Sequence, residues 1–205
     1  MDEKIIVVRG LGVELGGVRI LRSVGFEAAA GDFVAVLGAN GTGKSTLLRC
    51  LAGLQRTSAG GVDVFGGPPV DEPAFWRDVV LVADEPAWYP GLSVREHLEL
   101  MRGVHRSTRL EIAEALELFG LTGHANLAPL SLSTGLRQRL FLAMGLVRPS
   151  RLLLLDEPER GLDPLFRGRL ASILDGYTAE GGTVVMATHD LDLARGARRV
   201  TLEAA

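Results

Sequence analysis

The sequence predicts an α/β fold with a mostly parallel sheet, an antiparallel β region at the N-terminus and an inserted helical subdomain. Short apolar runs of strand length alternate with helix-forming stretches, and glycine or proline residues separate them. Between about residues 84 and 150 helical patterns follow one another without a strand, so this interval is the candidate for the inserted subdomain. The chain has 205 residues, 47% of them hydrophobic, and we expect it to form a single domain, 1–205.

Strands are predicted wherever a short apolar run is bounded by turn residues. The run Ile5–Val8 and the β-like stretch from about Val18 to Glu27 are separated by Gly16 and Gly17, so they read as a β-rich start. The remaining predicted strands are Phe33–Leu37, Val62–Phe65, Val79–Val82, Arg151–Leu155 and Thr183–Ala187.

Helices are predicted from apolar spacing and from capping signals. Ser93, with Glu96 three residues later, forms a capping box for a helix through about Gly103. Apolar residues recur at helical spacing from about Thr108 to Phe119. The remaining predicted helices are Thr46–Ala52, Ser133–Val147 and one that begins at Pro164.

A phosphate-binding loop joins the predicted strand Phe33–Leu37 to the helix after it. Its glycines allow backbone turns that a side chain would block, so that successive N–H groups can point at a polyphosphate. Lys44 adds a positive charge, Ser45 offers a hydroxyl ligand for Mg²⁺, and the helix start turns its dipole toward the anion. The pattern predicts a P-loop NTPase, with the nucleotide held by Gly38, Ala39, Asn40, Gly41, Thr42, Gly43, Lys44, Ser45 and Thr46.

Two acids follow the apolar strand Arg151–Leu155. Parallel sheets present their ligand sites at the carboxyl ends of the strands, so Asp156 is expected near the phosphate loop. Asp156 can meet the Mg²⁺ that Ser45 holds, and Glu157 can polarise a water for attack on the γ-phosphate. The alternative is a solvated acidic turn.

His189 follows the strand Thr183–Ala187, again at a carboxyl end. A neutral imidazole at that edge can donate a hydrogen bond to the γ-phosphate or to the attacking water. A structural histidine is the alternative. For the three other histidines, which lie in or beside helical surface stretches, we expect a structural role: His97, His105 and His124.

Two more residues stand before predicted helices. Ser133, with Gly135 in the first turn, gives an uncrowded helix start beside a hydroxyl, which can bind an anion or act as a simple N-cap. Asp163 comes before Pro164 and can cap the next helix.

Taken in order, these motifs resemble the nucleotide-binding domain of the ATP-binding-cassette (ABC) ATPases, over nearly the whole chain. The resemblance implies that two such domains sandwich two ATP molecules head to tail, each phosphate loop facing the Ser133 helix of the partner. It casts Glu157 as the base and His189 as the switch residue, and it adds Gly135 and Asp163 to the nucleotide site. The matching pieces are the phosphate loop, the region around Asp84, Leu132–Leu136, Asp156–Glu157, Gly161–Asp163 and His189.

Three positions depart from the family pattern. The usual signature Leu-Ser-Gly-Gly-Gln stands here as Leu-Ser-Thr-Gly-Leu, residues 132–136. The usual glutamine after the strand Val79–Val82 corresponds to Asp84, an acid that can still reach Mg²⁺ through water. The usual adenine-stacking aromatic corresponds to Leu15, which weakens base stacking and with it the preference for ATP over GTP.

The leading interpretation is the ATP-binding and ATP-hydrolysing subunit of an ABC transporter, with ATP and Mg²⁺ as cofactors. It would dimerise on ATP, as a homodimer or with a second ABC ATPase, and drive a separate transmembrane permease. The loop from Asp84 to Arg95, with Trp88 and Tyr89, would dock on that permease or pack into the helical subdomain. The compact size resembles stand-alone ATPases of bacterial export systems, including the haem exporter of cytochrome c maturation, which favours export.

Three alternatives remain open at this stage. A soluble ABC ATPase can act as a mechanical or regulatory module on nucleic acid or ribosomes, although this chain shows neither two fused cassettes nor long coiled insertions. A small-molecule kinase shares the phosphate loop but leaves Ser133 and Glu157 unexplained. A nucleotide-binding subunit with poor catalysis would fit the changed signature and Asp84, but not the retained catalytic residues.

Composition narrows the partners and the compartment. The net charge is −3 and the basic residues are scattered, so no nucleic-acid partner is expected. The single cysteine, Cys50, excludes an internal disulfide and fits a reducing compartment. No secretion signal is visible, and the apolar runs are far shorter than a membrane-spanning helix needs. We expect a cytoplasmic protein held at the inner face of the cell membrane by its permease.

Overall fold

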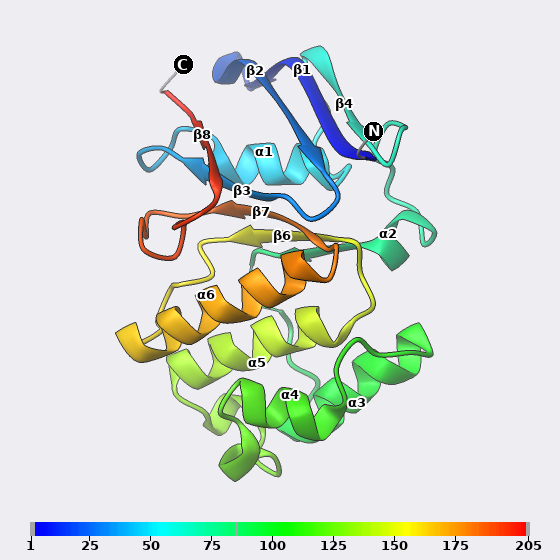
Figure 1. Cartoon of the computed structure of the whole chain (residues 1–205), viewed down its shortest axis with the longest axis vertical. Coiled ribbons are helices and arrows are strands. Elements are labelled where there is room, and N and C mark those ends of the chain that lie inside the picture. Colours follow the sequence, from blue (N-terminus) through cyan, green and yellow to red (C-terminus); the bar gives the residue numbers. More distant parts are fainter. Residues whose placement is uncertain (1–2, 85, 204–205) are drawn as a thin grey trace.

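The computed structural model describes residues 3–84 and 86–203. An antiparallel sheet lies at one end of the molecule, a parallel sheet crosses its middle, and a layer of helices forms the other end (Figure 1). The predicted α/β class, with a parallel sheet and an N-terminal antiparallel region, is confirmed.

The antiparallel sheet has the strand order β2-β1-β4. Its hairpin continues to the turn at Gly16 and Gly17, because Leu15 pairs with Val18 across it. Both glycines have positive φ, a conformation that glycine adopts without a steric penalty. Pairing therefore extends further than the apolar runs predicted, and the strand bounds are β1 Lys4–Leu15, β2 Val18–Ala29 and β4 Ala59–Val64.

The second sheet has the order β5-β6-β7-β3-β8, and each neighbouring pair is parallel. Four of its strands were predicted, whereas the edge strand β8 was not, because its residues are mostly exposed and carry no apolar pattern. The bounds are β3 Phe33–Leu37, β5 Val79–Val82, β6 Leu152–Asp156, β7 Thr183–Ala187 and β8 Arg198–Thr201.

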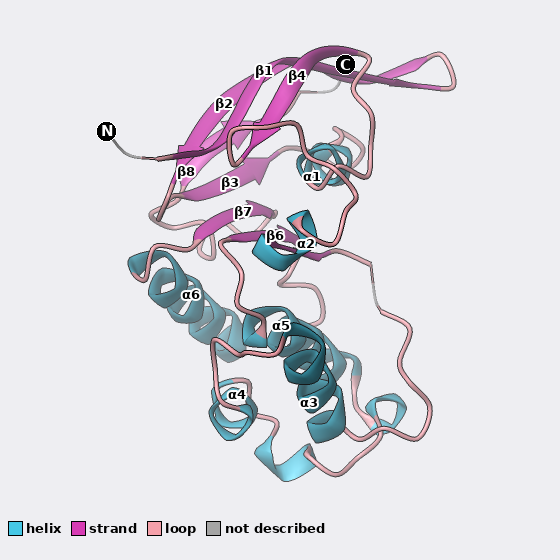
Figure 2. Cartoon of the chain, turned by 90° about the vertical axis from the view of Figure 1, so that its right-hand side faces the viewer, coloured by secondary structure: helices cyan, strands magenta, loops and turns pink. Residues whose placement is uncertain are grey.

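The two faces of the parallel sheet belong to two different cores. In β6, Leu152 and Leu154 join one apolar cluster, whereas Leu153 and Leu155 join the other. Side chains alternate across a strand, so a continuous apolar run is what a sheet buried on both faces requires. Helix α1 (Lys44–Leu51) fills the space between the two sheets, as Figure 2 shows.

Helices cover the opposite face of the parallel sheet and share one apolar cluster with it (Figure 2). The helix α3 begins with the predicted capping box, since the Ser93 side chain accepts from the backbone N–H of Glu96 and the Glu96 side chain accepts from that of Ser93. The bounds are α3 Val94–His105, α4 Ile112–Leu118, α5 Thr134–Val147 and α6 Pro164–Ala179, with the short turns η1 Thr122–His124 and η2 Pro129–Ser131.

Three local features differ from the sequence analysis. The helix expected from about Thr108 begins only at Ile112, because the backbone N–H of Arg109 donates to the carbonyl of Val147 and leaves the helical path. The short helix α2 (Phe75–Asp78) was not predicted. His97 is not a surface residue: it is fully buried, and its ring lies between the carbonyl of Ser93 and the backbone N–H of Tyr89.

Among the described helices, none combines the length and the apolar character that crossing a bilayer requires.

Candidate nucleotide site

Three loops meet at the carboxyl ends of neighbouring parallel strands. They follow β3, β6 and β7, and all three lie on the left side of the molecule in Figure 1. The register places Asp156 opposite Ala187, so the acidic pair and His189 leave the sheet at the same level. This juxtaposition is what the positions of these residues after their strands predicted.

The loop after β3 is shaped by its glycines. Gly41 and Gly43 have φ of 82° and 90°. A Cβ on Gly43 would lie 2.6 Å from the Cδ2 of Leu21, so the loop packs directly against β2. A hydrogen bond of 2.9 Å from the Thr42 hydroxyl to the carbonyl of Ala39 closes the turn. The loop therefore holds its shape without a ligand, which is the preorganisation that phosphate binding requires.

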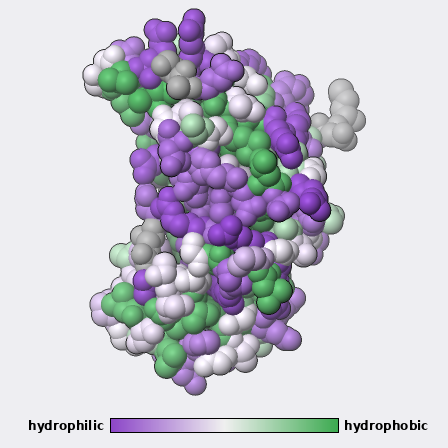
Figure 3. Space-filling model, turned by 90° about the vertical axis from the view of Figure 1, so that its left-hand side faces the viewer, coloured by the Kyte–Doolittle hydropathy of each residue, from purple (hydrophilic) through white to green (hydrophobic). Residues whose placement is uncertain are grey.

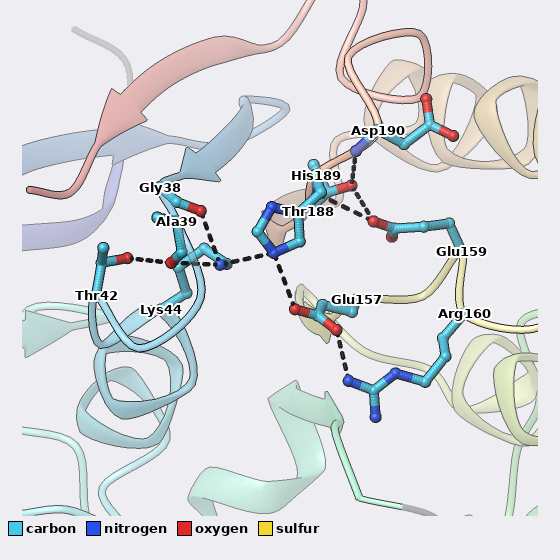
Figure 4. A network of polar contacts seen from close by, with 10 residues as sticks. All are labelled: Gly38, Ala39, Thr42, Lys44, Glu157, Glu159, Arg160, Thr188, His189 and Asp190. Atoms are coloured by element: carbon cyan, nitrogen blue, oxygen red, sulfur yellow. Dashed lines mark hydrogen bonds and ion pairs between the residues drawn. The ribbon is translucent and has the colours of Figure 1, made fainter.

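Lys44 points into this loop and is almost fully buried, at 6% exposure. Its Nζ donates to the carbonyls of Gly38 and Ala39 at 2.9 and 3.2 Å. The same atom lies 3.0 Å from the Nε2 of His189 (Figure 4). The ammonium group is thus fixed at the mouth of the loop, next to the histidine of another strand.

Asp156 lies beside the first turn of α1. The Ser45 hydroxyl donates a hydrogen bond to its carboxylate. Burial raises the pKa of Asp156 and the nearby Glu157 charge adds to this, while the Ser45 hydrogen bond opposes it. A hydroxyl and a carboxylate in contact are a pair of oxygen ligands suited to Mg²⁺.

Glu157 lies between His189 and Arg160, as Figure 4 shows. Its Oε1 is 3.2 Å from the Nε2 of His189, and its Oε2 accepts from the Nη2 of Arg160 at 2.5 Å. Partial burial alone would raise the pKa of this carboxyl, but the Arg160 hydrogen bond and the nearby positive charges outweigh it and lower the pKa. Glu157 is therefore held as a carboxylate, the form that can accept a proton.

The sequence analysis did not identify Arg160 or Glu159 as site residues. Glu159 is buried, and its Oε1 accepts from the Thr188 hydroxyl at 2.6 Å and from the backbone N–H of His189 at 3.0 Å. Glu159 contacts the loop after β7, and Arg160 pairs with Glu157, three positions earlier in the chain. Their proximity to Asp156 in the chain was the only available signal.

The start of α5 approaches the acidic pair across a small cleft. Ser133 is the N-cap of α5, and its hydroxyl oxygen accepts from the backbone N–H of Leu136 at 3.3 Å. A Cβ on Gly135 would lie 2.7 Å from the carbonyl of Gly161, so only glycine permits this approach. The cleft has a volume of about 140 Å³ and is lined by Ala83, Trp88, Thr134, Arg137, Gln138, Phe141, Asp156, Glu157 and Arg160.

Asp163 caps α6 through a hydrogen bond from the backbone N–H of Phe166 to its Oδ1, at 2.9 Å. That hydrogen bond, assisted by the charge of Arg139, lowers the pKa of Asp163. Arg139 of α5 also pairs with its Oδ2 and stacks over the ring of Phe166. The capping alternative is confirmed, and a role of Asp163 in binding nucleotide stays a prediction.

Two other unusual positions are Asp84 and Leu15. Asp84 is exposed and pairs with Arg49 of α1 at 2.9 Å, and its charge is near enough to help raise the pKa of Asp156. Its assignment as a metal ligand stays a prediction. Leu15 is 43% exposed at the end of the β1–β2 hairpin, as an adenine contact would have to be.

The face that carries these loops is hydrophilic at its centre. Figure 3, which views the molecule from the left side of Figure 1, shows a broad polar area there, with apolar side chains gathered above and below it. A polar centre of this kind suits a charged ligand such as a polyphosphate.

Comparison with known families decides the assignment of this site. The family model described as ABC transporter matches residues 21–160, which include the phosphate loop, the α5 start and the acidic pair. The chain belongs to this family. It is thus an ABC ATPase domain, as the order of its motifs predicted.

Curated relatives of this ABC ATPase domain are transporter subunits. An Fe(3+) ions import ATP-binding protein of Streptomyces coelicolor is 39% identical over 93% of this chain and 56% of its own length. An aliphatic sulfonates import ATP-binding protein of Pseudomonas syringae is 37% identical, over 91% of this chain and 67% of its own. A cytochrome c biogenesis ATP-binding export protein of Mesorhizobium japonicum is 38% identical, over 90% of this chain and 91% of its own length. The chain thus spans little more than half the length of the Fe(3+) ions import ATP-binding protein.

A solved structure agrees with the assignment. The ATP-binding subunit of an ABC transporter superposes with a TM-score of 0.84 at 27% identity, over 98% of this chain and 86% of its own length. The fold and the order of elements are therefore those of ABC ATPase domains.

Proposed function

We propose that this ABC ATPase domain is the ATP-binding and ATP-hydrolysing subunit of a transporter, working with a separate transmembrane permease. The observation that carries the proposal is that His189 lies within hydrogen-bond reach of both Lys44 and Glu157, where the loops after three strands meet. A strand, a phosphate loop and a helix alone would fit many NTPases. A histidine that contacts both the loop lysine and the second acid fits hydrolysis.

The phosphate loop fits a triphosphate. Lys44 has its donors turned into the loop mouth, where Gly38 and Ala39 carbonyls and His189 now accept them. A bound phosphate would offer stronger acceptors, because hydrogen bonds to charged oxygens exceed those to neutral carbonyls. The N–H groups of the first α1 turn, from Lys44 onward, would add to the binding.

The acidic edge fits a magnesium ion. The Ser45 hydroxyl and the Asp156 carboxylate already touch, and both are hard oxygen donors. They would hold Mg²⁺ at the β- and γ-phosphate end of the nucleotide, where the ion supplies charge neutralisation. Asp84 would contribute only after leaving Arg49.

Glu157 is proposed to accept the proton of the attacking water. Its carboxylate is kept ionised by Arg160 and faces the same space as the Lys44 ammonium. His189 would bind the γ-phosphate through Nε2, the atom now turned toward Lys44 and Glu157. Proton transfer by a positioned carboxylate contributes about 10²–10⁴-fold to such a reaction.

A second copy, or a second ABC ATPase, would complete the site. The Ser133 hydroxyl and the glycine backbone at 135 are exposed or half-buried at the start of α5, where they can meet a phosphate that another chain holds. The substitution of glutamine by Leu136 leaves that hydroxyl and the close-approach glycine in place. ATP would thus lie between two chains.

The loop that follows Asp84 is proposed to dock on the permease. Tyr89 is 55% exposed, whereas Trp88 packs against the buried His97 with ring centroids 5.7 Å apart. The loop therefore combines an exposed aromatic side chain with a firm attachment to α3, as an interface anchor requires. Such docking would hold the chain at the inner face of the membrane.

The expectation of export is not confirmed. Two of the relatives described above carry import in their names and one carries export. These names favour import as the direction of transport. The permease would determine which substrate is transported.

A phosphate-release assay tests the proposal. Purified protein with ATP and Mg²⁺ should release inorganic phosphate, and Lys44→Ala should abolish the release. Transfer of the phosphate to an added metabolite, with no free phosphate, would favour the kinase alternative and contradict hydrolysis. Recovery of the chain in membrane fractions only when its permease is co-expressed would support transport over a soluble module.

A further inference from the structure

Glu159 is a buried carboxylate that joins two of the three site loops. It is 8% exposed, on the loop after β6, and its Oε1 accepts from the Thr188 hydroxyl at 2.6 Å and the His189 backbone N–H at 3.0 Å. Thr188 and His189 follow β7. Figure 4 shows the Glu159 side chain reaching across to this loop, on the side of His189 opposite to Lys44.

The loop after β7 depends strongly on this carboxylate. The Thr188 hydroxyl donates to Glu159 and also accepts from the backbone N–H of Asp190 at 2.9 Å. One side chain therefore organises three consecutive residues, 188–190. The His189 ring itself is exposed, and it reaches Lys44 and Glu157 only if the backbone that carries it is held in place.

This arrangement is costly for stability. Within residues 3–84 and 86–203, the second carboxylate oxygen of Glu159, Oε2, is buried and has no hydrogen-bond partner. Burying a carboxylate with half of its acceptors unused costs free energy that a neutral side chain would not. A neutral side chain could link the two loops at a lower cost in stability. The buried carboxylate therefore points to a functional role.

We propose that Glu159 is a positioning residue that holds His189 against Lys44 and Glu157. The inference rests on the proposed hydrolysis of ATP, in which His189 binds the γ-phosphate. Glu159 lies two residues after Glu157 on the same loop, so movement of that loop would carry the base and the histidine together. A displacement of about 1 Å in a reacting group can cost about 100-fold in rate.

Replacement of Glu159 by leucine tests the role. Glu159→Leu keeps the volume but removes both acceptors, and should lower kcat about tenfold or more while the affinity for ATP stays within about twofold. Glu159→Gln keeps an acceptor oxygen toward Thr188 and His189 and should restore most of kcat. The exposed Glu117 of α4 provides the matched control, Glu117→Leu, which should match the wild type.

A double-mutant cycle with His189 separates positioning from a general structural effect. If Glu159 acts through His189, Glu159→Leu should cost little further kcat in a His189→Ala background. Equal losses in both backgrounds would overturn the proposal, as would a Glu159→Leu protein with wild-type kcat or a Glu159→Gln protein as slow as the leucine variant.

Folding and function are tested separately. If Glu159→Leu does not fold, Glu159→Asp retains the charge but shortens the reach to His189, and it should lower kcat with unchanged ATP affinity. Wild-type kcat in the aspartate variant would then overturn the positioning role. Failure of the wild-type protein to release phosphate would contradict the proposed function instead, and the two failures are therefore distinguishable.

Discussion

The Nζ of Lys44 lies 3.0 Å from the Nε2 of His189, 145 residues away in the chain. The same histidine nitrogen lies 3.2 Å from the Oε1 of Glu157, so His189 links the loop lysine to the second acid after β6. Lys44 and His189 thus hold each other at the place where the last phosphate of a nucleotide would enter. Binding of that phosphate would replace the contact by two new ones, one to each residue.

Lys44→Ala should weaken ATP binding by about tenfold or more, because hydrogen bonds to charged groups contribute about 1.5–3 kcal/mol. Titration with a fluorescent ATP analogue measures the change. Lys4→Ala is the matched control, since Lys4 lies in an exposed ion pair with Glu27 on the antiparallel sheet and should leave the affinity unchanged. Equal affinities of wild type and Lys44→Ala would refute the assigned phosphate contact.

Glu157→Gln should retain ATP binding, slow steady turnover by about 100-fold or more, and accumulate an ATP-bound dimer. The amide is isosteric with the carboxylate but cannot take a proton from water. Phosphate release and size-exclusion chromatography with ATP measure the two effects. Glu117→Gln serves as control, and wild-type turnover in Glu157→Gln would remove this residue from the role of base.

Arg160→Ala should move the acid limb of the kcat profile to higher pH. The guanidinium lowers the pKa of Glu157, so the carboxylate stays ionised to lower pH than it would alone. Without Arg160 the pKa rises, and protonation inactivates the base at a higher pH. Arg195→Ala is the control, because Arg195 forms the same i,i+3 pair with Asp192 away from the site. An unmoved limb in Arg160→Ala would contradict this coupling.

Burial raises the pKa of the Cys50 thiol to about 11, so the folded protein should react slowly with iodoacetamide at pH 8. Above pH 9 the unfolded thiol ionises while the folded one does not, so the free energy of unfolding should fall between pH 9 and 11. Mass spectrometry of the labelled protein checks the rate. Labelling as fast as in guanidinium chloride would show that the thiol is accessible.

The local parts of the site could be predicted from the sequence. Gly38–Ser45 is a continuous motif between a strand and a helix, and the acids and His189 directly follow apolar strands. The period-2 division of Leu152–Leu155 between two cores explains why these runs are apolar throughout.

The remaining parts depend on contacts between distant segments. Glu159 and His189 are 30 residues apart, and no local pattern connects them. Likewise, the exposed β8 is a strand only because Leu37 and its neighbours pair with it, and Asp84 is drawn to Arg49 of another element. Tertiary partners of this kind leave no periodic signal in the chain.

ATP-dependent cross-linking between the loop and the α5 start of two chains tests the central claim most directly. The test protein carries Cys50→Ser and Glu157→Gln, together with the two new cysteines Asn40→Cys and Ser133→Cys. With ATP and a short bis-maleimide it should form a covalent dimer. Each single cysteine variant should stay monomeric. Two results together would contradict the account. The double-cysteine protein would stay monomeric with ATP, and the same double-cysteine protein without the Glu157→Gln change would hydrolyse ATP at the wild-type rate. The Ser133 helix of a second chain would then not close this site.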